Sequence, residues 1–99
     1  MSLKQLGGEN ITVSSTAIGP TSSEVTDEVM MAEFQLLSGG ALHCQTKTTP
    51  TAVGITGDFR YGPGAIWRVW GHDEIKDFLM IALTVNALVA VQFYGTGKT

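Results

Sequence analysis

The chain has 99 residues, enough for one domain with one modest core. Hydrophobic residues make up 43% of it and charged residues only 15%, against about 25% in a typical soluble domain. The six lysine and arginine residues are scattered singly and the formal net charge is −3, so we expect no nucleic-acid partner. This shortage of charge predicts apolar side chains on the outer surface and therefore self-association, with solvation by Ser, Thr, Gln and Gly as the alternative.

The composition also bears on compartment and membrane contact. A single cysteine, Cys44, excludes an intramolecular disulfide. The longest apolar stretch, residues 78–93, is interrupted by Thr84, Asn86 and Gln92, so we expect no membrane-spanning helix and no membrane partner. No charged region followed by an apolar run opens the chain, so no secretory signal is expected.

The N-terminal third reads as an arm, a strand and a loop. Residues 1–8 form a polar lead that predicts a flexible arm or the entry to a first strand, and part of it could be an expression leader; a single β domain over residues 9–99 is expected to follow. Residues 10–16 are β-branched and alternate in polarity, which predicts a half-buried strand. Residues 21–28 are polar and predict a surface loop or a short edge strand.

The next segment is open to two interpretations. Residues 29–37 place apolar side chains at every second position, and residues 41–46 resume after a short glycine turn at residues 38–40. Two such runs predict a β-hairpin. The first run also contains good helix formers, which keeps a helix open as the alternative.

The second half of the chain continues in short elements. We expect a loop at residues 48–51, a turn at residues 61–64 and a strand at residues 65–70 that points Ile66, Arg68 and Trp70 to one side. A polar corner at residues 71–76 then precedes two apolar strands. These strands are expected at residues 77–85 and 88–94. A longer helix over residues 73–83 is the competing interpretation.

Together these elements predict an all-β fold. Short strands at roughly regular spacing, separated by turn signals, are typical of a small β-sandwich or a jelly-roll-like barrel. One short helical turn is expected near residues 73–77.

Candidate catalytic and metal-binding groups do not converge in the sequence. His43 and Cys44 are neighbours in a predicted strand and so point to opposite faces, and His72 sits on a corner beside two acids. No G-x-S-x-G motif appears, and the C-terminal G-T-G-K-T tail lacks the spacing of a phosphate-binding loop. We therefore expect no enzyme, no cofactor and no metal.

Aromatic and apolar strand residues are the candidate interaction residues. Trp67, Trp70 and Tyr61 gather around a Gly-Pro-Gly turn, as core residues, as interface anchors or as a platform for a sugar ring. The last apolar strands have two apolar faces. We expect such a face to bury between subunits; its members are Leu79, Ile81 and Leu83 or, on the opposite face, Met80 and Ala82.

From Ile11 onward the order of features resembles a family of small all-β phage and prophage virion proteins from head and tail genes. The segments that carry the resemblance are ITVSSTAIGPTS, AEFQLLSGGALHCQT, TTPTAVGITGDFRYGPG and AIWRVWGHDEIKDFLMIALTVNALVAVQFYGTG. Thr46-Lys47 stands where members of that family usually carry an Asp-Gly turn.

The resemblance implies a structural protein that works in a symmetric assembly and carries no catalytic residue. Its partners would be further copies of itself, as a trimer or a higher oligomer among the options, and other virion proteins. It would be located in the virion, or in the bacterial cytoplasm before assembly. The alternative function is a small carbohydrate- or surface-binding β module that uses exposed aromatic residues.

Overall fold

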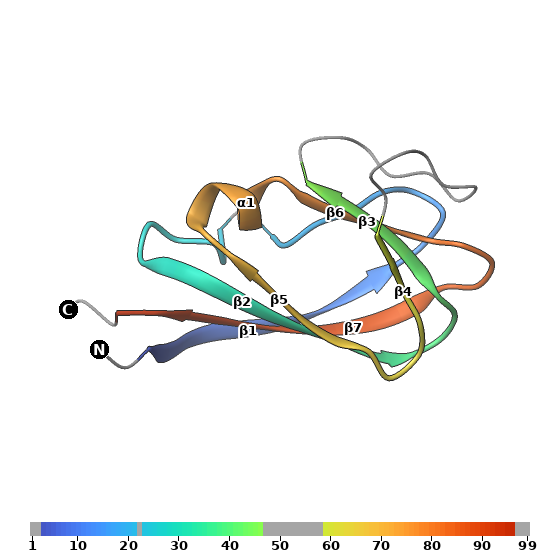
Figure 1. Ribbon diagram of the computed structural model, residues 1–99, viewed down its shortest axis with the longest axis horizontal. Coiled ribbons are helices and arrows are strands. Elements are labelled where there is room, and N and C mark those ends of the chain that lie inside the picture. Colours follow the sequence, from blue (N-terminus) through green and yellow to red (C-terminus); the bar gives the residue numbers. More distant parts are fainter. Residues whose placement is uncertain (1–2, 22, 47–58, 97–99) are drawn as a thin grey trace.

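The structure is a computed structural model that describes residues 3–21, 23–46 and 59–96. Its elements are, in chain order, β1 (Lys4–Val13), β2 (Val29–Ser38), β3 (Leu42–Thr46), β4 (Phe59–Tyr61), β5 (Ile66–Trp70), α1 (His72–Lys76), β6 (Phe78–Ala82) and β7 (Ala87–Gly95) (Figure 1). None of the helices in this described part has the length and apolar character needed to cross a membrane.

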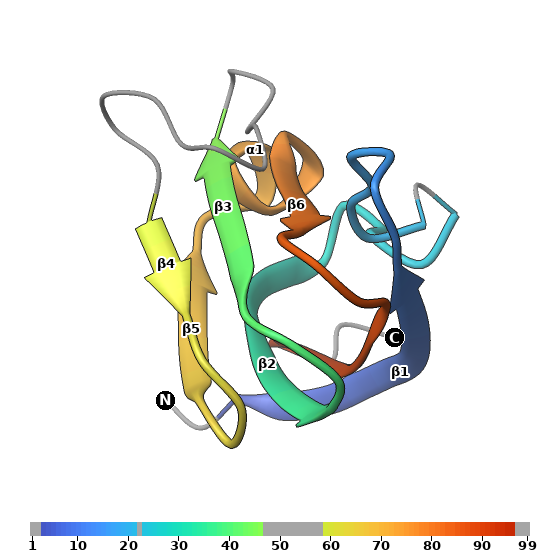
Figure 2. The ribbon, with the colours of Figure 1, turned by 90° about the vertical axis from the view of Figure 1, so that its right-hand side faces the viewer.

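The strands form two antiparallel sheets that face each other. One sheet has four strands in the order β1-β7-β2-β5, and the other has three in the order β4-β3-β6 (Figure 2). This architecture confirms the predicted all-β, sandwich-like fold. The short helix α1 confirms the helical turn expected at the polar corner.

Both helical alternatives are wrong, because residues 29–37 belong to β2 and the helix at the corner ends at Lys76. The predicted hairpin of residues 29–46 is also wrong. The two strands form, but β2 pairs with β5 and β7 in one sheet, whereas β3 pairs with β4 and β6 in the other. Each strand has one apolar face, and crossing between sheets lets those two faces bury against each other across the core.

Of the two interpretations of the N-terminal segment, the structure agrees with strand entry for residues 4–8, which belong to β1 and not to a flexible arm. β1 begins at Lys4 because β7 supplies a long partner, and their register runs to Lys4 opposite Gly95 with an irregularity between Gln5 and Gly7. After Val13 the chain leaves this sheet and passes beside β6 of the other sheet. There Ile18 N–H donates to the Met80 carbonyl at 2.9 Å, and Met80 N–H donates back at 2.7 Å.

The loop expected after β1 is present and is fastened to the sheet by one carboxylate. Glu9 accepts hydrogen bonds from the backbone N–H of Thr21 at 2.8 Å and from its hydroxyl at 2.6 Å. Val25, a residue of this loop, is buried as part of the hydrophobic core cluster. The loop predicted at residues 48–51 and the end of the tail, residues 97–99, lie outside the described residues.

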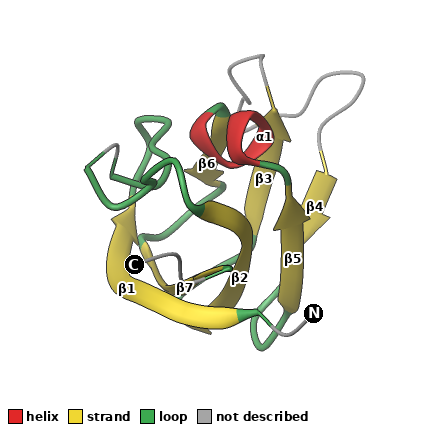
Figure 3. Cartoon of the chain, turned by 90° about the vertical axis from the view of Figure 1, so that its left-hand side faces the viewer, coloured by secondary structure: helices red, strands yellow, loops and turns green. Residues whose placement is uncertain are grey.

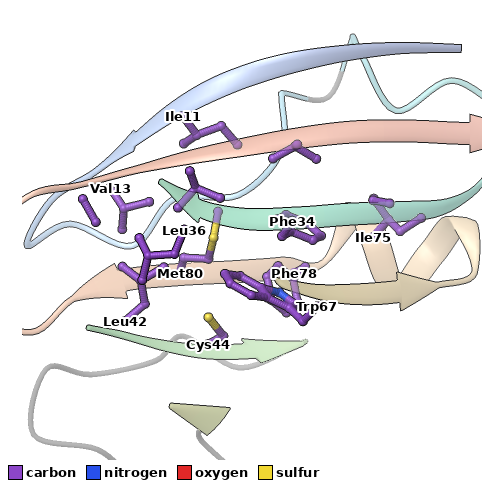
Figure 4. Close-up of a cluster of buried hydrophobic side chains, with 14 of the residues drawn as sticks. Ile11, Val13, Phe34, Leu36, Leu42, Cys44, Trp67, Ile75, Phe78 and Met80 are labelled. Carbon is purple, nitrogen blue, oxygen red and sulfur yellow. The ribbon is translucent and has the colours of Figure 1, made fainter. Parts of the chain in front are cut away.

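The core lies between the two sheets (Figure 4). Phe34 of β2 meets Phe78 of β6 with ring centroids 4.9 Å apart, which joins the sheets through an aromatic contact. At one end α1 packs near β2 and β5 and buries Ile75 completely. The remaining fully buried side chains are aliphatic or sulfur-containing: Leu36, Leu42, Met80, Val13, Val29, Val89, Val91 and Cys44, with Phe93 as a further ring.

Candidate functional site

The three aromatic candidates do not form one surface platform. Trp67 is 7% exposed and stacks on Phe34 at 5.5 Å and on Tyr61 at 4.0 Å between ring centroids. Tyr61 is half-buried at the end of β4. Trp70 points to the other face of β5 and is 60% exposed. Two of the three therefore pack inside their own chain, and Trp70 alone presents a largely open ring.

The apolar candidates of β6 also divide between inside and outside. Met80 and Ala82 face the core of the same chain and are 0% and 5% exposed. Ile81 lies on the opposite face of β6 but is only 8% exposed, while Leu79 and Leu83 are half-buried. This strand therefore presents much less free apolar surface than its composition predicts.

A more exposed apolar surface lies on the outer face of the four-stranded sheet. The registers align the outward side chains of β1, β7, β2 and β5 in rows across the sheet. The first row is Gln5, Tyr94, Met31 and Trp70, the second is Gly8, Gln92, Glu33 and Arg68, and the third is Asn10, Ala90, Gln35 and Ile66. We call this surface the outer face.

The outer face changes in character from one edge to the other. At the β5 edge Ile66 and Trp70 are 57% and 60% exposed, and between them Arg68 Nη2 lies 2.8 Å from Glu33 Oε2. At the β1 edge the row members are amides and a glycine. β1 and β5 lie at opposite edges of the sheet (Figure 3).

A shallow hollow opens on the polar half of the outer face. It has a volume of about 310 Å³ and is lined by Gln5, Gly8, Glu9, Asn10, Ala90, Val91 and Gln92. Gly8 leaves this space because it has no side chain, and an added Cβ would lie 2.9 Å from the Val91 carbonyl oxygen. The Tyr94 hydroxyl donates to Gln92 Oε1 at 2.7 Å and holds that side chain in place.

In the part of the chain that the structure describes, no group of three or more His, Cys, Asp or Glu residues could hold a metal ion. Cys44 faces the core, and His43 lies on the opposite face of β3, as expected from strand geometry. His72 Nδ1 lies 3.6 Å from Asp73 Oδ1, and Nε2 lies 3.9 Å from Asp27 Oδ1. Burial raises the pKa of Tyr61 above 10.0, and negative charge at Cys44 adds to the rise.

The sequence interpretation missed Met31, Tyr94 and the amides of β1 and β7. The alternation within β5 predicts that Ile66 and Trp70 lie on the face opposite Trp67, and the structure agrees. Which residues of other strands complete the rows depends on strand order, and no motif in the chain encodes that order.

Comparison of the chain with protein-family models, with curated proteins and with solved structures finds no match.

Proposed function

We propose that this chain is a structural or assembly protein of a phage or prophage particle and works through homo-oligomeric packing rather than catalysis. Two independent features support the proposal. One is the outer face, and the other is the resemblance of the sequence to small all-β virion proteins.

The observation that carries the assembly role is the exposure of Ile66 and Trp70. Both side chains are more than half exposed on one strand, and half-buried Ala90 and Tyr94 continue the outer face across the sheet, whereas Met31 between them is buried at 8% exposure. Exposed apolar patches on soluble domains mark interaction sites because leaving them in water costs free energy. The low charged fraction of 15% leaves few residues to solvate such a patch.

The proposed partners are copies of the same chain and other proteins of the particle. The four described lysine and arginine residues are distributed over four elements: Lys4 in β1, Arg60 in β4, Arg68 in β5 and Lys76 in α1. This scattering supports a protein partner over nucleic acid, since phosphate binding needs clustered cations. The proposed location is the virion, or the bacterial cytoplasm before assembly.

The particle role is tested by co-expressing the chain with the genes encoded on either side of it. We expect those neighbours to include head or tail genes, and we expect the chain to co-sediment with the resulting particles in many copies, measured by quantitative mass spectrometry. Neighbours unrelated to phage particles, together with a chain that stays at the top of the gradient, would contradict the virion assignment.

A second candidate function, carbohydrate binding, is favoured by the hollow over Gly8. Gln5, Asn10 and Gln92 supply neutral amides that both donate and accept hydrogen bonds, which suits sugar hydroxyls. Both carboxylate oxygens of Glu9 already accept hydrogen bonds from Thr21. The site differs from the aromatic platform expected from the sequence, because Trp67 and Tyr61 are not part of it.

Carbohydrate binding is tested by titrating ¹⁵N-labelled protein with a panel of neutral oligosaccharides. Binding in the hollow predicts shifts confined to Gln5, Asn10, Gln92 and their neighbours, abolished in Asn10→Ala and Gln92→Ala. A panel that leaves these resonances unmoved at millimolar sugar would remove this candidate.

A further inference from the structure

The backbone of β5 has an unpaired edge made by Ile66, Arg68 and Trp70. Leu36 N–H donates to the Ala65 carbonyl at 3.0 Å, and Gly71 N–H donates to the Met30 carbonyl at 2.8 Å. Because hydrogen-bonded pairs alternate along antiparallel strands, the odd-numbered residues of β5 bond to β2 and the even-numbered residues turn their N–H and C=O groups outward. No described strand is hydrogen-bonded to that side, since β5 ends the sheet order, although β4 of the other sheet lies near this edge (Figures 2 and 3).

The two edges of the four-stranded sheet are protected to different degrees. Natural edge strands are guarded by short length, charges, proline or bulges that discourage pairing with another chain, and glycine weakens a strand. β1 carries Lys4, two glycines and a register irregularity between Gln5 and Gly7. β5 has an uninterrupted register with β2, exposes Ile66 and Trp70, and has Arg68 as its only charge.

We propose that β5 pairs with β5 of a second copy of this chain, antiparallel about a two-fold axis at Arg68, and joins two four-stranded sheets into one. The inference rests on the proposed self-association and names its interface. In this register Ile66 of one copy stands opposite Trp70 of the other, and Arg68 stands opposite itself. All the outward N–H and C=O groups of β5 then have partners.

The side chains fit this register on both faces of the joined sheet. On the outer face it pairs the aliphatic Ile66 with the aromatic Trp70, a favourable cross-strand combination, and the symmetry repeats it. On the inner face it places half-buried Val69 at the register position of Trp67 of the second copy, whose ring stays in the aromatic stack of its own chain. A foreign strand would have no reason to match both positions, and this internal symmetry favours a second copy as the occupant.

The central pair needs charge compensation, because two arginines meet at the axis. Each Arg68 forms an ion pair with Glu33 of its own chain at 2.8 Å. The row of side chains across the proposed β5–β5 junction, called the β5 seam, therefore contains two ion pairs with no net charge. Removing the carboxylate leaves like charges opposed, which destabilises a cross-strand pair. We therefore expect Glu33→Gln to raise the dimer dissociation constant several-fold and Glu33→Gln/Arg68→Gln to restore it.

Arg68→Pro and Arg68→Ala form a matched pair of variants. Both remove the arginine side chain, but only proline removes the backbone N–H, so their difference measures the contribution of that N–H to association. Proline at residue 68 removes an N–H that points away from β2, so it deletes no hydrogen bond among the residues that the structure describes, whereas alanine keeps that N–H. By sedimentation at micromolar concentration, Arg68→Ala should remain associated and Arg68→Pro should be monomeric. Equal association of the two folded variants would overturn the seam.

Cysteine cross-linking tests the register and does not depend on how well the proline variant folds. Hydrogen-bonded antiparallel pairs have Cα atoms about 5.5 Å apart, within disulfide range. Under mild oxidation Arg68→Cys should form a covalent dimer by itself. Ile66→Cys and Trp70→Cys should cross-link only when mixed with each other, and the wild type, whose Cys44 is fully buried, is the control.

The outcomes separate this interface from the broader proposal. An associated wild type in which Arg68→Cys fails to cross-link would overturn the β5 seam and leave self-association standing through another surface. A wild type that is monomeric at micromolar concentration would remove both.

Discussion

At the scale of residues, the two tryptophans of β5 show how position within a strand decides role. Trp67 and Trp70 differ by an odd number of positions and so face opposite ways, Trp67 into the aromatic stack with Phe34 and Tyr61 and Trp70 into solvent. Trp67 stabilises the fold of a single chain. Trp70 has a free surface that a partner would cover.

Tryptophan emission separates these roles. Trp70→Phe leaves only the buried Trp67, and we expect blue-shifted emission that does not change on dilution. The wild type should lose its red component as concentration rises through the association range, because Trp70 becomes covered. Emission of the wild type that is constant from nanomolar to high micromolar concentration would count against a role for Trp70 in association.

The phenol of Tyr61, which belongs to the same aromatic stack, makes the stability of the fold depend on pH. Its pKa in the folded chain is raised above the unfolded value of 10.0 by burial, with a contribution from Cys44. Such a group stabilises the fold fully below pH 10, and that stability is lost as the pH rises through the folded pKa, since the unfolded chain releases the proton first. Between pH 9 and 11 the melting temperature of the wild type should therefore fall more than that of Tyr61→Phe. Parallel declines in the two proteins would contradict this account.

At the scale of elements, the chain forms the predicted strands but connects them differently. The alternation of apolar residues predicts β2, β3, β5 and β7 and the helical corner before β6, because periodicity reports which face of each element is buried. It does not report which strand a face meets. The hairpin of residues 29–46 was wrong for that reason. Residues 4–8 lie in β1 rather than in an arm because β7 lies between β1 and β2 and pairs with both.

The crossing between β2 and β3 depends on Gly39. Its φ is +97°, and a Cβ there would lie 2.2 Å from the Asn86 carbonyl oxygen. We expect Gly39→Ala to lower the free energy of unfolding by more than about 1 kcal/mol, because both the left-handed backbone and the close contact oppose a side chain. Gly62→Ala is the control, since nothing lies within 4 Å of a Cβ there. Equal urea midpoints for the two variants would be inconsistent with this explanation.

The contact between the sheets depends on Phe34. It is 0% exposed and touches both Trp67 and Phe78, so Phe34→Ala should cost about 3–5 kcal/mol of unfolding free energy. The adjacent Gln35 points outward and is exposed. Gln35→Ala should therefore change stability by no more than about 0.5 kcal/mol. Chemical denaturation of both variants checks the assignment, and a similar loss in both would show that the inner and outer faces are misassigned.

At the scale of the whole molecule, the question is where the apolar surface expected from the low charged fraction lies in the structure. The sequence predicts surplus apolar surface and, on that basis, a subunit contact, and it favours the last strands as the location. β6 instead uses Met80 and Ala82 inside its own chain and leaves Ile81 only 8% exposed. The two most exposed large apolar side chains, Trp70 and Ile66, lie at the β5 edge of the four-stranded sheet, where exposed side chains and outward backbone groups occur together. Val85, Leu37, Met30 and Ile18 are exposed elsewhere.

The central claim, that this chain acts by associating with itself, is tested most directly by sedimentation equilibrium of the wild-type protein at micromolar concentration. The account predicts a mass at least twice that of the chain, reached reversibly as concentration rises. A mass equal to that of one chain throughout the micromolar range would contradict it.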